Sequence, residues 1–162
     1  MVKTNQKQKI LIILVVILLV GVIASNKSIP KNTQLQTNII QTKTFQSKIM
    51  KFTIGLPSNY QGQEKLGSVT VSTPKGILYI DRNGTNFDNI EDYVQDLGKK
   101  NKFILSNKKN LQINSLEAIV GNTNREKLYF IYSNYAVYTL SAKEEPLFPD
   151  LDQIAQSFRY TP

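Results

Sequence analysis

The chain of 162 residues contains neither cysteine nor histidine. Without cysteine it can form no disulfide, has no thiol nucleophile and offers no thiol for lipid attachment. Without histidine it lacks the side chain that most often serves as a general base near neutral pH and as a transition-metal ligand. Because these absences remove common catalytic and metal-binding arrangements, we expect a protein that is not an enzyme, with no catalytic residue, metal site or cofactor.

Acidic residues are absent from the first 51 positions, which contain eight lysines. Residues 52–162 carry twelve Lys and Arg against twelve Asp and Glu, so the formal net charge of +8 belongs to the N-terminal part. The remainder lacks the basic excess that binding to phosphate backbones requires. We therefore expect no nucleic-acid partner.

One long apolar run, ILIILVVILLVGVIA, occupies residues 10–24. As a helix it would rise about 22 Å, which is short against a hydrocarbon core of about 30 Å. The lysines before the run suit a membrane anchor and a secretory signal peptide equally, and both place the rest of the chain outside the cytoplasm. Two outcomes stay open: a single-pass protein of the cell membrane, or a secreted protein cleaved near Ala24. A buried core helix is disfavoured, because the run has no polar face.

Composition divides the chain into three parts. Residues 1–25 form a basic tail with the transmembrane anchor or signal segment. Residues 26–42 are rich in Asn, Gln, Thr and Lys, which predicts a flexible linker. Residues 43–162 are long enough to form one globular domain with its own core.

Alternating apolar and polar residues predict strands in this domain. We expect the first strands at residues 50–56, 69–71 and 77–81, with residues 62–67 as a loop. Later apolar segments, with a turn at Ser133-Asn134, predict strands at residues 103–106, 111–113, 116–120, 127–132 and 135–141.

Two segments show helical spacing instead. In residues 88–98 the apolar positions are Ile90, Tyr93, Val94 and Leu97. We expect Asp88 to cap this helix and Gly98 to end it. A second helix is predicted after Pro149, with the apolar positions Leu151, Ile154, Ala155 and Phe158.

The last predicted hairpin is apolar on both faces, with Leu128, Phe130 and Tyr132 on one face of its first strand and Tyr129 and Ile131 on the other. A strand that is apolar on both faces is covered on both faces. We therefore predict an α+β domain: an antiparallel β-sheet of about six or seven strands with helices packed on both faces, preceded by an N-terminal transmembrane or signal helix.

Three groups of residues are candidates for function. Tyrosines near the hairpin combine apolar area with a polar hydroxyl and could form a partner surface, with packing in the core or on a sheet face as the favoured explanation for most of them: Tyr129, Tyr132, Tyr135 and Tyr138. The acids Asp88, Glu91, Asp92 and Asp96 could bind calcium or act as general acids, or could simply cap and solvate a helix. A second cation site could form from Glu144, Glu145, Asp150 and Asp152, with helix N-terminal charge as the alternative.

Four segments resemble the PsbP-like family in their order and spacing: FTIGLPSNY (52–60), FDNIEDYVQDL (87–97), INSLEA (113–118) and FRYTP (158–162). The resemblance covers residues 43–162 and implies an antiparallel sheet between helices. Relatives in this family include an extrinsic subunit of photosystem II, a Ran-binding protein of eukaryotes and uncharacterised bacterial anchored or secreted proteins. Histidines used around metal in the photosynthetic members have no counterpart here.

Two functional hypotheses follow. The first is a membrane-anchored extracytoplasmic PsbP-like domain that acts as a non-catalytic binding or assembly module, with the membrane contacted through residues 10–24 and a protein or envelope partner. The alternative is a secreted or anchored envelope enzyme that hydrolyses glycans through two carboxylates, which would have to lie about 5–9.5 Å apart in one cleft.

Overall fold

A computed structural model describes residues 41–162. The predictions for residues 1–25, and those for the linker up to residue 40, lie outside the described residues. Within residues 41–162 no helix has the length and apolar character needed to cross a bilayer. The elements, in chain order, are β1 (Thr42–Ser47), β2 (Phe52–Pro57), β3 (Gln61–Lys65), β4 (Ser68–Thr73), β5 (Gly76–Gly84), α2 (Ile90–Asn101), β6 (Ser106–Ile113), β7 (Leu116–Asn122), β8 (Lys127–Ser133), β9 (Ala136–Ala142), the 3-10 turn η1 (Glu145–Leu147), α3 (Phe148–Ser157) and β10 (Arg159–Tyr160).

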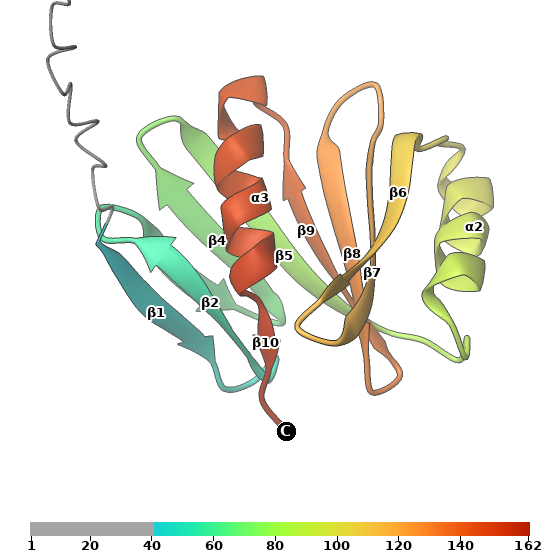
Figure 1. The fold of residues 1–162 in the computed structure, drawn as a ribbon, viewed down its shortest axis with the longest axis horizontal. Coiled ribbons are helices and arrows are strands. Elements are labelled where there is room, and N and C mark those ends of the chain that lie inside the picture. Colours follow the sequence, from blue (N-terminus) through green and yellow to red (C-terminus); the bar gives the residue numbers. More distant parts are fainter. Residues whose placement is uncertain (1–40) are drawn as a thin grey trace, which may run out of the picture. The chain divides into compact units, whose positions relative to one another are not determined.

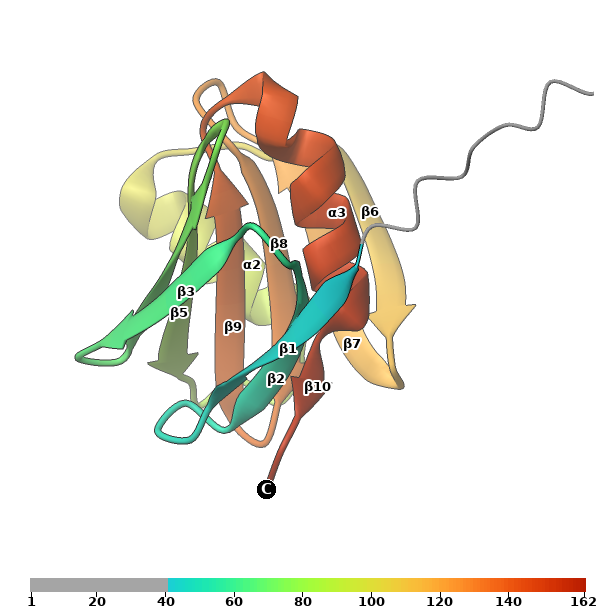
Figure 2. The same ribbon diagram turned by 90° about the vertical axis from the view of Figure 1, so that its left-hand side faces the viewer.

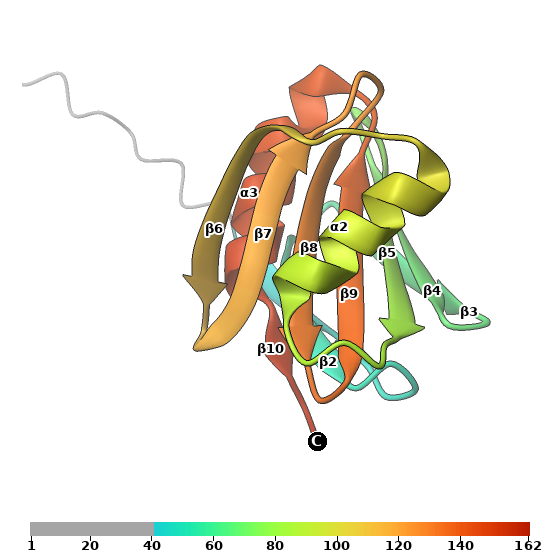
Figure 3. The ribbon, with the colours of Figure 1, turned by 90° about the vertical axis from the view of Figure 1, so that its right-hand side faces the viewer.

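The strands form two antiparallel sheets. Seven of them make a sheet in the order β3-β4-β5-β9-β8-β7-β6, and β2 lies between β1 and β10 in a three-stranded sheet. Helix α2 covers one face of the larger sheet (Figure 3), while α3 and the smaller sheet cover the other (Figures 1 and 2). The predicted α+β class, with antiparallel strands and a helix on each face, is confirmed; the separate three-stranded sheet was not predicted.

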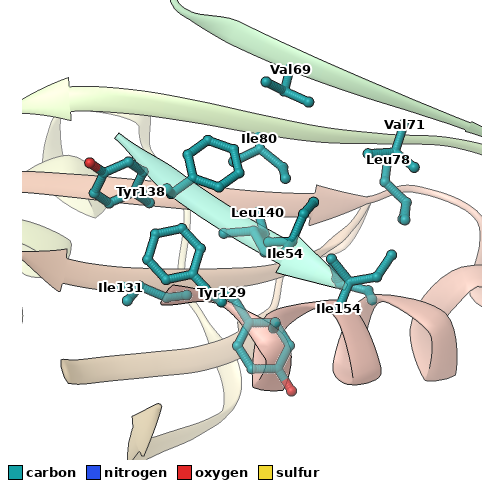
Figure 4. Close-up of a cluster of buried hydrophobic side chains, with 14 of the residues drawn as sticks. Ile54, Val69, Val71, Leu78, Ile80, Tyr129, Ile131, Tyr138, Leu140 and Ile154 are labelled. Carbon is teal, nitrogen blue, oxygen red and sulfur yellow. The ribbon is translucent and has the colours of Figure 1, made fainter. Parts of the chain in front are cut away.

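The larger core lies between the seven-stranded sheet and the layer formed by α3 and β2. Inward-facing side chains of β4, β5, β8 and β9 meet Ile54 of β2 and Ile154 of α3 there (Figure 4). At its centre the ring of Phe52 stacks on Phe158 with 5.3 Å between centroids, and both rings contact Tyr138. These three rings join both sheets to the end of α3, so the smaller sheet belongs to the same core as the larger one.

Helix α2 buries the predicted stripe in a second, smaller core. Ile90, Tyr93 and Val94 pack against Phe130 of β8 and other residues of that sheet face. The predicted cap was wrong by one position: the side chain of Asn89, not of Asp88, accepts a hydrogen bond from the Asp92 backbone N–H at 2.9 Å. Asn serves here because its carbonyl oxygen reaches the N3 amide from an extended backbone.

The end of α2 also differs from the prediction. The helix continues past Gly98 to Asn101, and Lys102 ends it in the left-handed region with φ of 54°. The Phe103 backbone N–H then donates to the Gly98 carbonyl at 3.1 Å, as in a left-handed helix cap. Gly98 therefore lies three residues before the end of the helix rather than beyond it.

Two edge strands were predicted wrongly because their sequences are polar. Residues 61–65 form β3 instead of a loop, paired with β4 from Gln61 opposite Ser72 to Lys65 opposite Ser68. Residues 106–113 form the single strand β6, with an irregularity between Ser106 and Lys109, whereas residues 103–105 lie before it. Edge strands carry polar and lysine side chains that discourage pairing with another chain, and these residues hide the alternation.

The predicted hairpin that is apolar on both faces is confirmed. Strands β8 and β9 lie in the middle of the large sheet, between the two cores. Their turn consists of Asn134 and Tyr135, one residue later than predicted, and both have positive φ. Positive φ at both central residues is what a two-residue type I′ hairpin turn requires.

Candidate functional site

The four candidate tyrosines do not share one surface. Tyr129 and Tyr138 point into the larger core, where the Tyr138 hydroxyl donates to the Met50 carbonyl at 2.6 Å. Tyr132 packs beside the smaller core on the opposite sheet face. Tyr135, in the turn, is 64% exposed. Because side chains alternate between the faces of a strand, the four tyrosines lie in three different places and do not form the predicted partner surface. Of the four, only Tyr135 is largely exposed to solvent.

The carboxylate of Asp150 in α3 is held by two partners. The hydroxyl of Tyr60 donates to it at 2.6 Å, and the Lys75 ammonium lies 2.8 Å from the same oxygen. Burial, reinforced by the hydrogen bond to Asp150, raises the pKa of Tyr60 to about 12. The interaction fixes the start of α3 against the β2–β3 connection and the β4–β5 turn.

Asp152, two residues further on, has an equivalent pair of partners. Tyr129 donates to it at 2.7 Å, and the Lys127 ammonium lies at 2.5 Å. Burial raises the pKa of Tyr129, and the hydrogen bond to Asp152 raises it further. Lys127 also lies 5.8 Å from the ring centroid of Phe148, which adds a cation–π contact. Both aspartates are therefore used in fixing α3 on the sheet.

The acids of helix α2 are likewise engaged. Glu91 forms an ion pair with Lys108, and Asp96 lies 2.7 Å from Lys100 one turn later. Asp92 accepts a hydrogen bond from the amide of Asn89 at 2.8 Å. In the described part of the chain, no three acidic side chains come close enough together to hold a metal ion. Neither of the two acidic groups singled out in the sequence gathers into a cation site.

A groove of about 570 Å³ lies between α2 and the segment that connects it to β6. Its lining combines apolar side chains with three lysines and one glutamate: Val94, Phe103, Ile104, Leu105, Lys99, Lys102, Lys108 and Glu91, beside Gln95 and Gly98. Ile104 is 89% exposed at its rim. Since Lys108 pairs with Glu91, the groove keeps the positive charge of two lysines beside apolar surface.

The connecting segment is shaped by alternation and by two glycines. Phe103 and Leu105 pack on the smaller core while Ile104, between them, is directed to solvent. A Cβ atom at Gly98 would lie 3.1 Å from the Phe103 carbonyl oxygen, and one at Gly121 would lie 3.1 Å from the Leu105 Cβ. The chain can run this close to the helix and to β7 because both positions are glycine.

The sequence contains a local signal that part of this segment is exposed. The segment 99–105, KKNKFIL, places lysines directly before three large apolar residues. Three consecutive apolar residues cannot all face a core in extended backbone, so at least one must be exposed beside the lysines.

Two carboxylates, Glu91 and Glu117, line a second hollow of about 470 Å³. It lies over Asn110, Leu111 and Ala118 of β6 and β7 and shares Glu91 with the groove. Among the described residues this hollow brings two acids to one open space, which the alternative hypothesis requires. Glu91 is the acid that also pairs with Lys108.

Comparison with solved structures identifies the class of this fold as PsbP-like. The domain is similar to cyanobacterial PsbP (CyanoP) from Synechocystis sp. PCC 6803, whose solution structure aligns with a TM-score of 0.51 at 11% sequence identity. The alignment covers 81% of this chain and 99% of that one. No protein-family model and no curated protein matches the sequence. The resemblance to the PsbP-like family is therefore confirmed at the level of the fold.

Proposed function

We propose that this chain is a membrane-anchored, extracytoplasmic PsbP-like domain that acts as a non-catalytic binding or assembly module through the groove beside α2. The observation that carries the proposal is the exposed Ile104 at the rim of a groove that also contains Lys99 and Lys102. Exposed apolar area rimmed by polar groups is typical of interaction sites. A partner that fits is a protein segment with an apolar side chain next to an acidic one.

The acids of the domain support a binding role over a catalytic one. Asp150 and Asp152 serve to fix α3, and Glu91 and Asp96 are engaged by lysines. A general acid or base must be able to reach a substrate proton, and an acid already paired within the fold is poorly placed to do so.

Site-specific photocross-linking tests the groove in the full-length protein. With p-benzoylphenylalanine at position 104, irradiation of membrane fractions should give one discrete protein adduct. The double substitution Lys99→Glu with Lys102→Glu should abolish it. The same probe at position 77, where Ile77 is 42% exposed, is the matched control and should give no adduct. Equal labelling from both positions would contradict the proposal.

The location outside the cytoplasm rests on residues 10–24 and is tested separately. The intact mass of the protein from a membrane fraction distinguishes a retained anchor from a form cleaved near Ala24. Protease added to intact cells or spheroplasts should reach residues 41–162 in the anchored form. Full protection of these residues inside the cytoplasm would contradict the proposed location.

The hollow shared by Glu91 and Glu117 favours envelope glycan hydrolysis as the second candidate function. This chemistry needs two carboxylates about 5–9.5 Å apart, and Glu91 would have to leave its ion pair with Lys108 to serve as one of them. Incubating the purified protein with cell-wall glycan should release reducing ends if this is right, and Glu117→Gln should stop the release. Absence of release from wild-type protein would remove this candidate.

A further inference from the structure

We infer that three turns at one end of the domain form a docking surface for a bilayer that contains anionic lipid. The turns are β1–β2, β3–β4 and β8–β9, which lie towards the lower side of the domain in Figures 2 and 3. They carry three of the five large apolar side chains that are exposed in the described part: Ile49 at 74%, Leu66 at 94% and Tyr135 at 64%. The groove beside α2 is a different surface.

Two of these side chains occupy backbone positions that normally exclude them. Leu66 and Gly67 are the two central residues of the β3–β4 turn, with φ of 48° and 80°. Tyr135 follows Asn134 in the β8–β9 turn, with φ of 55°. Type I′ turns favour Asn-Gly because most side chains clash with the following carbonyl oxygen in the left-handed region. Residues with strained backbone of this kind persist where other interactions compensate the strain, and they are concentrated at functional sites.

Burial of the Leu66 and Tyr135 side chains within the domain does not compensate this strain, because both project into solvent. A water-soluble turn would gain stability from Asn or Gly at either position. A bilayer surface would offset the strain, because leucine enters the acyl boundary and tyrosine prefers the headgroup level.

The charge around the turns fits anionic lipid. Lys48 and Lys51 flank Ile49, and Lys65 precedes Leu66; all three lysines are exposed. None of them forms an ion pair with an acid within residues 41–162. The nearby acid Glu64 accepts a hydrogen bond of 2.6 Å from Ser47 of β1. Lysines near an anionic bilayer each contribute about 1 kcal/mol of attraction.

Hydrogen bonds hold the turns in a fixed arrangement. The Ser47 to Glu64 bond joins the β1–β2 turn to the end of β3. The Thr161 backbone N–H donates to the Lys51 carbonyl at 2.9 Å, which links the β1–β2 turn to the segment after β10. The Asn134 side-chain amide donates to the Tyr160 hydroxyl at 3.2 Å, which links β10 itself to the β8–β9 turn. Because the three turns are fixed relative to one another, they can contact one bilayer surface together.

Single-tryptophan reporters test the inference in the full-length protein, which has no tryptophan of its own. Leu66→Trp places a reporter at the proposed surface. Ile104→Trp is the matched control, because Ile104 is also almost fully exposed but lies on the segment after α2. Each variant is reconstituted in nanodiscs of brominated phosphatidylcholine, with and without phosphatidylglycerol, and tryptophan quenching is measured.

The Leu66→Trp emission should be quenched in discs with phosphatidylglycerol, and the Ile104→Trp emission should not. Replacing both Lys48 and Lys65 by Gln should lower the ratio of docked to undocked protein by about 25-fold, or about fivefold per lysine. Three results would overturn the inference: no quenching in any disc, equal quenching of both reporters, or burial of the Leu66→Trp reporter only after envelope protein is added. The last result would assign the surface to a protein partner.

Discussion

The hydroxyl of Tyr129 donates a 2.7 Å hydrogen bond to the carboxylate of Asp152 and so joins the middle of strand β8 to helix α3. Tyr129→Phe should lower the free energy of unfolding by about 1–3 kcal/mol, because a hydrogen bond to a charged acceptor is lost. Chemical unfolding of the full chain in mild detergent, followed by near-UV circular dichroism, measures the change. Tyr135→Phe is the control and should be neutral, since Tyr135 is exposed in the turn. An equal effect of both substitutions would contradict this role.

The raised tyrosine pKa values predict loss of stability at alkaline pH. The pKa of Tyr60 is about 12 in the folded protein, and that of Tyr129 is also raised. In the unfolded chain both hydroxyls ionise near pH 10, so between about pH 10 and 12 the folded state binds more protons than the unfolded state. The free energy of unfolding should therefore fall as pH rises through this window. Below pH 10 these two groups should have no effect.

Unfolding curves at pH 9, 10 and 11 test this slope. In the double variant Tyr60→Phe with Tyr129→Phe the decline above pH 10 should become shallower, because neither group can ionise. An unchanged slope would mean that other groups cause the alkaline loss.

Gly62 in β3 should not tolerate a larger residue. A Cβ atom there would lie 2.5 Å from the Cδ2 atom of the Phe45 ring in β1. Gly62→Ala should cost about 1–3 kcal/mol, as overpacking usually does. Gly84→Ala is the matched control, because a Cβ atom at Gly84 would meet nothing within 4 Å. Adding Phe45→Leu to Gly62→Ala should recover part of the loss; no recovery would show that the ring is not the cause.

The β3–β4 turn should become more stable when Leu66 is replaced. Leu66→Asn should raise the free energy of unfolding by a few tenths of a kcal/mol to about 1 kcal/mol, because Asn tolerates positive φ far better than Leu. Thermal unfolding of the full chain measures the gain. In the lipid assay, a Tyr135→Trp reporter should be quenched less when Leu66→Asn is also present than when Leu66 is retained. A variant that is both less stable and equally quenched would contradict the strain argument.

The sequence predicted those parts of the fold that depend on local periodicity. The apolar stripes of α2 and α3 and the hairpin of β8 and β9 are each recognisable within about ten residues, because burial on one or two faces leaves a repeating pattern. Helix α3 begins at Phe148, slightly before the predicted start after Pro149. The PsbP-like fold was recognised from the order of such segments. Edge strands could not be recognised in this way, since β3 and β6 are polar where they face solvent.

The candidate site was harder to predict, because it depends on which residues the tertiary structure leaves uncovered. Alternation along the strand predicts that Tyr129 and Tyr132 lie on opposite faces of the sheet. It does not predict that α3 covers one of these faces and α2 the other. The pattern of residues 99–105 predicts that at least one of its apolar side chains is exposed, but nothing local shows that it is Ile104 rather than Phe103 or Leu105. The groove beside α2 therefore became visible only once the path of the segment between α2 and β6 was known.

The backbone N–H of Gly55 in β2 donates to the Ser157 hydroxyl at 2.8 Å, across a separation of 102 residues. Phe158, next along the chain, supplies a ring of the central aromatic cluster, and β10 then adds the third strand to the smaller sheet. The N-terminal strands of the domain thus remain without their packing layer until its last residues are present. During synthesis, this domain would remain incomplete until residues 157–160 had left the ribosome, and a fragment truncated before Ser157 would lose the ring that stacks on Phe52 of β2.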